Sequence, residues 1–198
     1  MPLTLPRGKP SPIWLAVLLW LAGALNPLHA QLIANFTPNR TGGCSPLAVI
    51  FQNTTTGAGP GAIYSWNFGN GNSITTTDGT LPVAATYSIG QVYTVTLSVQ
   101  YGGQTSTKSI NINVYKPPVV NFQGTNTLGC QPLSSSFTSS STPGDGFITS
   151  YFWDFGDGIT LNTTSSNVNH IYNFTGIFTV GLTVTNSDGC TSTFQRVN

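Results

Sequence analysis

Two parts of this sequence carry closely similar residues in the same order, and that internal repeat limits the possible folds more than any other feature. The matching stretches are residues 34–36 and 120–122, 43–47 and 129–133, 64–71 and 151–158, and 93–99 and 178–184. The offset stays between 85 and 87 residues, as expected for a tandem duplication with small changes in loop length. A unit of this length exceeds the roughly 20–50 residues of a solenoid repeat and is large enough to form a small domain. We therefore predict two similar domains in tandem.

Proline residues separate the two copies. Pro117 and Pro118 follow Lys116 where the first copy ends. Because prolines have no amide donor and hold the backbone extended, this segment predicts a short, stiff linker. The predicted division is a signal peptide at residues 1–30, a first domain at residues 31–116, called module 1, and a second domain at residues 117–198, called module 2.

The N-terminal segment has the three parts of a secretory signal peptide. Arg7 and Lys9 precede an apolar run at residues 13–25, which is too short to span a bilayer core of about 30 Å comfortably. Pro27 interrupts a helix after that run, and the small residue Ala30 suits a signal peptidase. We predict cleavage after Ala30, a secreted or cell-surface location, and no stable membrane insertion after cleavage. An uncleaved N-terminal anchor is the alternative.

The remaining sequence alternates with period two, as half-buried strands do. Apolar residues occupy every second position of residues 93–99 and again of residues 178–184. Gly-rich turn clusters separate such runs, and each copy has one tryptophan, Trp66 or Trp153. The predicted fold class is all-β, with two tandem immunoglobulin-like antiparallel β-sandwiches.

Charged residues are scarce in this chain, and their scarcity argues against nucleic acids and anionic membranes as partners. Only 6% of the residues are charged, and Glu is absent. No basic stripe could neutralise the phosphates of a nucleic acid, so we expect no nucleic-acid partner. No polybasic patch indicates attachment to an anionic membrane.

Three segments of module 2 together resemble the signature of PKD (polycystic kidney disease) domains: residues 151–158 (YFWDFGDG), 170–172 (HIY) and 176–180. Module 1 is similar, but Asn67 and Asn70 replace the two aspartates and Ala85 replaces the histidine. The resemblance covers essentially the whole chain after residue 30. It implies a seven-stranded immunoglobulin-like sandwich in each module. The motif residues are Trp66, Phe68, Gly69 and Gly71 in module 1, and Trp153, Asp154, Phe155, Gly156, Asp157, Gly158, His170 and Tyr172 in module 2.

The polar motif residues have a chemical and a structural interpretation. Asp154 and Asp157 could bind a cation, but an EF-hand loop needs more carboxylates and a bidentate Glu. Module 1 has Asn at both positions, which favours a turn in which these side chains accept backbone hydrogen bonds. His170 has no nucleophile motif near it in the sequence, so we interpret it as a structural histidine beside Tyr172. We predict no catalytic residue, no cofactor and no metal.

Two functional hypotheses follow. The first is a non-catalytic extracellular or cell-surface module that binds an extracellular protein or glycan, as in adhesion, or that acts as a spacer in a larger protein. The Gly-Cys-x-Pro and Ser-Asp-Gly-Cys segments resemble PKD variants of large secreted Bacteroidetes proteins, which implies such roles. The alternative is an N-terminal accessory fragment of a secreted polysaccharide- or protein-degrading hydrolase. The two differ in what the gene encodes beyond Asn198. We expect more residues there, because module 2 stops near the position that matches Ile112 of module 1.

Three cysteines leave one thiol over if a disulfide forms. Cys130 begins module 2, and Cys190 lies in its final turn. Cys44 is the counterpart of Cys130, but module 1 has Gln104 or Thr105 at the position of Cys190, so Cys44 has no partner in its own module. We therefore predict a Cys130–Cys190 disulfide and a free Cys44. Three plain buried thiols and a metal site are the alternatives.

Overall fold

A computed structural model describes residues 31–197 of the chain, so the predicted signal peptide lies outside the described residues. The described part consists of β-strands, turns and loops. Within it, no helix is long and apolar enough to cross a membrane.

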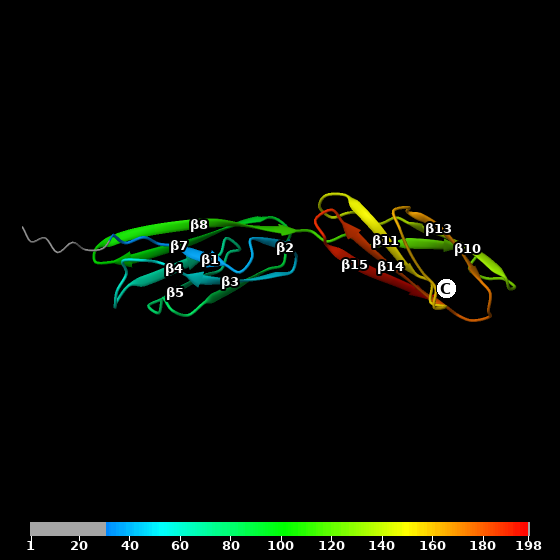
Figure 1. Ribbon diagram of the computed structural model, residues 1–198, viewed down its shortest axis with the longest axis horizontal. Coiled ribbons are helices and arrows are strands. Elements are labelled where there is room, and N and C mark those ends of the chain that lie inside the picture. Colours follow the sequence, from blue (N-terminus) through cyan, green and yellow to red (C-terminus); the bar gives the residue numbers. More distant parts are fainter. Residues whose placement is uncertain (1–30, 198) are drawn as a thin grey trace, which may run out of the picture. The chain divides into compact units, whose positions relative to one another are not determined.

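Module 1 has two sheets, with the strand orders β1-β3-β6 and β2-β8-β7-β4-β5. Neighbouring strands are antiparallel, except that β2 pairs with β8 in parallel. Figure 1 shows β7 and β8 as the long strands of this module. The strands are β1 (Phe36–Pro38), β2 (Gly42–Cys44), β3 (Leu47–Asn53), β4 (Ile63–Asn67), β5 (Ser73–Thr76), β6 (Val83–Tyr87), β7 (Val92–Tyr101) and β8 (Gln104–Tyr115).

Module 2 repeats this arrangement with sheets of order β13-β10-β9 and β12-β11-β14-β15. Its pairs are antiparallel throughout. The strands are β9 (Phe122–Thr125), β10 (Leu133–Ser139), β11 (Ile148–Asp154), β12 (Thr160–Thr163), β13 (Asn167–Tyr172), β14 (Thr179–Asn186) and β15 (Thr191–Val197).

Each module has its own aromatic core. The rings of Phe36 and Trp66 pack edge to face with 5.1 Å between their centroids, and those of Phe122 and Trp153 do the same at 5.2 Å. Such edge-to-face pairs are favourable beyond the apolar area that they bury. Because alternate residues of the facing sheets build these cores, each module is a β-sandwich of immunoglobulin-like type, and the predicted fold class is confirmed.

The final strands differ between the two modules. In module 2, β15 pairs with β14 up to Val197, which lies opposite Thr179. In module 1, β8 passes the equivalent point and continues to Tyr115, where it pairs with β2. The extra residues Ile112 and Val114 are buried in the core of module 1.

Candidate functional site

The Asp-Phe-Gly-Asp-Gly segment forms the turn between β11 and β12. The carboxylate of Asp154 accepts a hydrogen bond from the backbone N–H of Gly156 (3.0 Å), and that of Asp157 accepts one from Ile159 (3.1 Å). In module 1, Asn67 and Asn70 accept the equivalent bonds from backbone N–H groups two residues further on, at 2.9 and 3.1 Å. Both residue types therefore hold the same turn, and the turn does not depend on charge.

Glycine is required at one position of this turn for two reasons. Gly156 has a φ of 81°, a conformation that other residues adopt at a cost. A Cβ atom at Gly156 would also lie 2.5 Å from the carbonyl oxygen of Thr179 on the neighbouring strand. Gly69 is in the same position in module 1, where the Thr94 carbonyl oxygen lies 2.7 Å from the equivalent point. The turn is thereby packed directly on the central strand of its sheet.

His170 connects this turn to β13. Its Nε2 atom lies 2.7 Å from Oδ2 of Asp157, and its ring stacks on Phe155 with 4.0 Å between centroids. Module 1 has Ala85 in place of the histidine, and there Asn70 donates a hydrogen bond to the carbonyl oxygen of Thr86 instead. Since the histidine is stacked and nearly buried, its surroundings are those of a packing residue rather than of a base open to substrate.

A buried tyrosine holds the same turn from inside each module. The hydroxyl of Tyr172 donates a hydrogen bond to the carbonyl oxygen of Phe155 (3.0 Å), and that of Tyr87 donates one to Phe68 (3.1 Å). Burial raises the pKa of both phenols to about 12, and the charge of Asp157 adds to this effect at Tyr172, as Tyr93 does at Tyr87. Both side chains therefore stay neutral hydrogen-bond donors at physiological pH.

The cysteine prediction is wrong. The disulfide joins Cys44 to Cys190, with 5.6 Å between their Cα atoms, and Cys130 is exposed and has no disulfide. The physical reason is the position of β14. Cys190 follows the end of β14 at Asn186, whereas the sequence neighbours of Cys130, Gly129 and Gln131, line a groove with Phe178, which directly precedes the other end of β14. A strand of this length spans about 25 Å, far more than a disulfide can bridge. The repeat alignment identified the equivalent cysteines correctly, but a bridge within one module does not follow from it.

The bridge lies beside a set of hydrogen bonds around the linker. Asp145 and Lys116 are joined twice: the backbone N–H of Lys116 donates to Oδ2 of Asp145 (2.8 Å), and the N–H of Asp145 donates to the carbonyl oxygen of Lys116 (3.2 Å). The buried Asn186 amide group also donates to the Lys116 carbonyl oxygen (3.2 Å). Oδ1 of Asn186 accepts a hydrogen bond from the N–H of Cys190 (2.9 Å). One asparagine thus links the linker to the turn that carries the bridging cysteine.

Sequence reasoning missed Asn186 and Asp145. The available signal is a departure from the repeat. Asn186 stands where module 1 has Tyr101, so a polar residue replaces an aromatic one at the end of the equivalent strand. A buried polar side chain at such a position indicates a specific set of partners.

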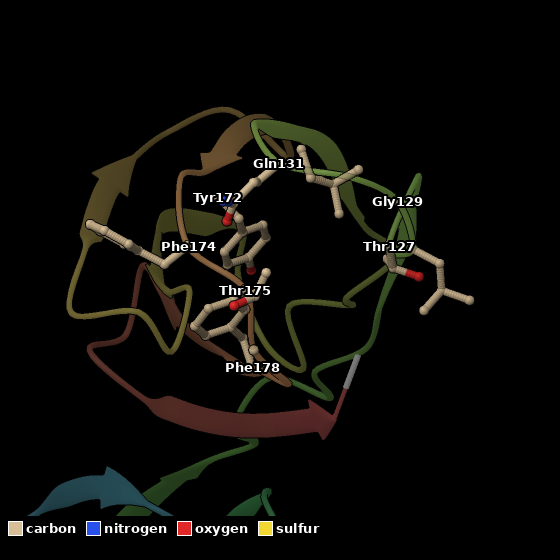
Figure 2. Close-up of a pocket in the computed structure, with 10 residues that line it drawn as sticks. Thr127, Gly129, Gln131, Tyr172, Phe174, Thr175 and Phe178 are labelled. Carbon is tan, nitrogen blue, oxygen red and sulfur yellow. The ribbon is translucent and has the colours of Figure 1, made fainter.

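A groove of about 240 Å³ opens at the other end of module 2. Figure 2 shows the rings of Tyr172 and Phe178 side by side in it, and these rings stack with 4.6 Å between their centroids. Its remaining wall includes Leu133 and Gly129, next to Cys130. Tyr172, a structural motif residue predicted from the sequence, lines this groove.

Family comparisons cover both modules. A PKD domain profile matches residues 33–114, and a second PKD domain profile matches residues 115–198. No curated protein sequence matches this chain at a significant level.

Several solved structures are similar to parts of the chain. The PKD1 domain of Vibrio anguillarum Epp is 34% identical and covers 42% of this chain and 93% of its own, with a TM-score of 0.37. The PKD1 domain of Vibrio cholerae metalloprotease PrtV is 33% identical and covers 41% of this chain and 94% of its own, with a TM-score of 0.36. The fibronectin(III)-like modules of Clostridium thermocellum CbhA are 11% identical and cover 82% of this chain and 91% of their own, with a TM-score of 0.40. With both profiles matched in adjacent positions on two separate β-sandwiches, the chain belongs to the PKD domain family and carries two PKD domains in tandem.

Proposed function

We propose that this chain is a non-catalytic extracellular spacer that holds two PKD domains in one arrangement. The observation that carries the proposal is the disulfide between Cys44 of module 1 and Cys190 of module 2. Neighbouring domains usually move relative to each other unless a large interface joins them. A covalent bond between the modules restricts that motion, which suits a spacer.

The linker supports the same role. Pro117 and Pro118 restrict the backbone between the modules, and Lys116 is held by Asp145 and Asn186. A linker with both prolines and specific hydrogen bonds transmits orientation from one domain to the next better than a Gly/Ser-rich one.

The disulfide also supports an extracellular or cell-surface location. Structural disulfides form and persist in oxidising compartments and are rare where thiols are kept reduced. Cys190 is almost fully buried, so the bridge is shielded from reductants on that side.

We further propose that the partner of this spacer is an extracellular protein or a glycan. The chain is poor in charge and its sequence is rich in Ser, Thr and Asn, so recognition would rely on hydrogen bonds and on exposed aromatic rings. Phe147 and Phe152 are such rings on module 2. Binding to immobilised glycans and extracellular proteins, measured with residues 31–198, tests this part.

The spacer role is tested by measuring how freely the modules move. Spin labels are introduced as noncanonical amino acids at the exposed positions Lys108 and Gln195, which avoids cysteine chemistry. Pulsed electron–electron double resonance then gives the distribution of distances between the two labels. We expect a narrow distribution for the oxidised chain and a broader one for the Cys44→Ser variant.

The matched control is Cys130→Ser, which removes an exposed thiol and leaves the bridge intact. It should give the same narrow distribution as the parent chain. Equal widths for the parent and Cys44→Ser would contradict the spacer proposal. Turnover of a polysaccharide or protein substrate by purified residues 31–198 would contradict its non-catalytic part.

A further inference from the structure

The outer face of the larger sheet of module 1 joins its strands through pairs of hydroxyl groups. The hydroxyls of Thr96 on β7 and Ser109 on β8 lie 2.8 Å apart, within hydrogen-bond distance. Those of Ser65 on β4 and Thr75 on β5 lie 3.3 Å apart. Side chains of neighbouring strands therefore use part of their hydrogen-bonding capacity on each other.

Module 2 has different residues at these four positions. The strand registers identify the equivalents: Phe152 for Ser65, Asn162 for Thr75, Gly181 for Thr96 and Gln195 for Ser109. Phe152 is 42% exposed, and the side chains of Asn162 and Gln195 are exposed as well. Because Phe152 and Gly181 have no polar side-chain group, the two amides opposite them lack the cross-strand partners that their equivalents in module 1 have. These amides are therefore open to hydrogen bonds with a ligand.

Gly181 lies in a central strand without a structural need for glycine. The strand β14 runs between β11 and β15 (Figure 1). The φ of Gly181 is not positive, and the nearest atom that an added Cβ would meet is Cγ of Gln195 at 3.6 Å, an ordinary contact. Module 1 has Thr96 at this position, so a side chain is compatible with the fold. Glycine inside a strand is unfavourable and often marks a place where a ligand approaches the backbone closely.

The four residues of module 2 follow one another across the sheet. Asn162 on β12 lies opposite Phe152 on β11. Gly181 on β14 lies diagonally from Phe152, and Gln195 on β15 lies opposite Gly181. Neighbouring strands are about 4.8 Å apart, so this row extends roughly 14 Å from β12 to β15. The row, called the Phe152 strip, presents an aromatic ring and a place without a side chain, with an amide at each end.

We propose that the Phe152 strip binds a neutral polysaccharide. A pyranose ring has an apolar face of C–H groups, which stacks on an aromatic ring, and hydroxyl groups at its rim. An amide both donates and accepts hydrogen bonds, as a hydroxyl does, so the amides of Asn162 and Gln195 suit that rim. A side chain at Gly181 would stand where the next sugar unit approaches. This inference rests on the proposed function and names the ligand class and the site of its glycan partner.

The polar groups beside the strip favour a neutral ligand over an anionic one. Asp154 lies opposite Gly181, and its carboxylate accepts a hydrogen bond from the N–H of Gly156. This negative charge would repel an anionic sugar unit. The neighbouring hydroxyls of Thr183 and Thr193 lie 2.7 Å apart and add polar surface without charge.

An NMR titration of isotopically labelled residues 31–198 tests the proposal. The neutral probes are cellohexaose, xylohexaose and laminarihexaose, the anionic probe is hexagalacturonate, and the peptide probe is a Pro-Pro-Gly repeat. We expect at least one neutral probe to cause saturable shifts of the Gly181 backbone amide and of the Asn162 and Gln195 side-chain amides. The absence of such shifts with all three neutral probes would overturn the proposal. Equally tight binding of the anionic probe or of the peptide would overturn it as well.

Two variants place the residues of module 1 in the strip. Phe152→Ser removes the ring and should weaken binding of the neutral probe at least about tenfold. Gly181→Thr should weaken it to a similar extent, because the new side chain blocks the approach. Since threonine suits a strand better than glycine, Gly181→Thr should also raise the melting temperature of module 2 by about 2–5 °C. A lower melting temperature, or unchanged binding, would show that Gly181 has no role in a ligand site and would overturn the proposal.

The matched control is Phe147→Ser, which removes an exposed ring of module 2 that lies outside the strip. Phe147 is 67% exposed and precedes the first residue of β11, Ile148. Binding of the neutral probe by this variant should equal that of the parent chain. A loss as large as that of Phe152→Ser would contradict the location of the site.

Failure of this inference and failure of the proposed function give different results. Glycan binding that persists in both Phe152→Ser and Gly181→Thr would overturn the Phe152 strip and leave the proposed glycan partner standing. A broad distribution of distances between the spin labels in the oxidised chain would contradict the spacer role, whatever the titration gives.

Discussion

Modules 1 and 2 build one turn with different residues. In module 2, the turn between β11 and β12 contains two aspartates, and His170 stacks beneath it. In module 1, two asparagines accept the same backbone hydrogen bonds, and the small residue Ala85 stands at the position of the histidine. The comparison teaches that the glycines, the aromatic core and the buried tyrosine determine this turn. The charged pair is an addition that one module has and the other does without.

The largest expected effect tests the shared core. Trp153→Ala removes a fully buried ring and should lower the free energy of unfolding of module 2 by about 3–5 kcal/mol. Trp66→Ala should do the same to module 1. Without residues 1–30, each module has a single tryptophan, so fluorescence in each variant reports the module that was not mutated. Guanidinium titration followed by circular dichroism and fluorescence separates the two transitions. A coincident loss in both modules would contradict independent cores.

The two glycines of each turn should respond differently to the same substitution. Gly156→Ala combines an unfavourable φ with a close approach to the Thr179 carbonyl oxygen, so we expect a loss of about 3–4 kcal/mol in module 2. Gly158→Ala also has a positive φ but has open space around it, so about 1 kcal/mol is expected. Gly69→Ala and Gly71→Ala should repeat this ratio in module 1. Equal effects of the two substitutions, measured by thermal unfolding, would show that the approach to the neighbouring strand is unimportant.

Alkaline pH should affect the modules alike, because the tyrosine is common to both. The folded pKa of Tyr87 and Tyr172 is about 12, above the ordinary value of 10 in an unfolded chain. Folding therefore favours the protonated phenol, and its stabilising contribution is complete below pH 10 and is lost as the pH rises through 12. We expect each module to lose about 2 kcal/mol over this range. Urea titrations from pH 9 to 12 measure it, and a loss confined to one module would contradict the equivalence of the two tyrosines.

The smallest effect concerns the residues in which the modules differ. Asp157→Asn keeps an acceptor for the Ile159 N–H but removes the charge beside His170, so module 2 should lose about 1 kcal/mol or less. Asp157→Ala removes both contacts and should cost about 2 kcal/mol. The reverse change, Asn70→Asp in module 1, should give no stabilisation because Ala85 offers no partner. Differential scanning calorimetry of the three variants orders these effects. A gain in module 1 would contradict the pairing argument.

The sequence predicted those features that recur in both copies. Two β-sandwiches, one tryptophan at the centre of each and the Asp/Asn turns follow from local pattern and from duplication, which report on contacts inside a single module. His170 was correctly placed beside Tyr172, since both lie on β13 and their rings meet edge to face at 4.5 Å between centroids.

The junction between the modules was not predictable in this way. Its residues differ in type from those at the equivalent positions of module 1. Cys190 stands where module 1 has Gln104, and Asn186 stands where module 1 has Tyr101. Internal comparison gives no partner for such positions. The pairing of Cys44 with Cys190 depends on which ends of two domains meet, and this information lies in the linker geometry rather than in the pattern of either module. The groove was missed because residues 127–131 and 174–178 line it together, and the repeat pattern does not show which loops of one module meet.

The disulfide also determines how the molecule responds to mechanical tension. A pull on the two ends of the described chain enters module 1 near Leu32 and leaves module 2 near Val197. In the oxidised molecule it passes through the sulfur–sulfur bond, so the 146-residue separation between Cys44 and Cys190 is removed from the path of the force. Only the short segments outside the bridge can then lengthen. Reduction would put that hidden length back into the path, about 500 Å of fully stretched chain. The redox state of one bond thus sets whether stretching finds a short, nearly inextensible tether or two domains that can unravel one after the other.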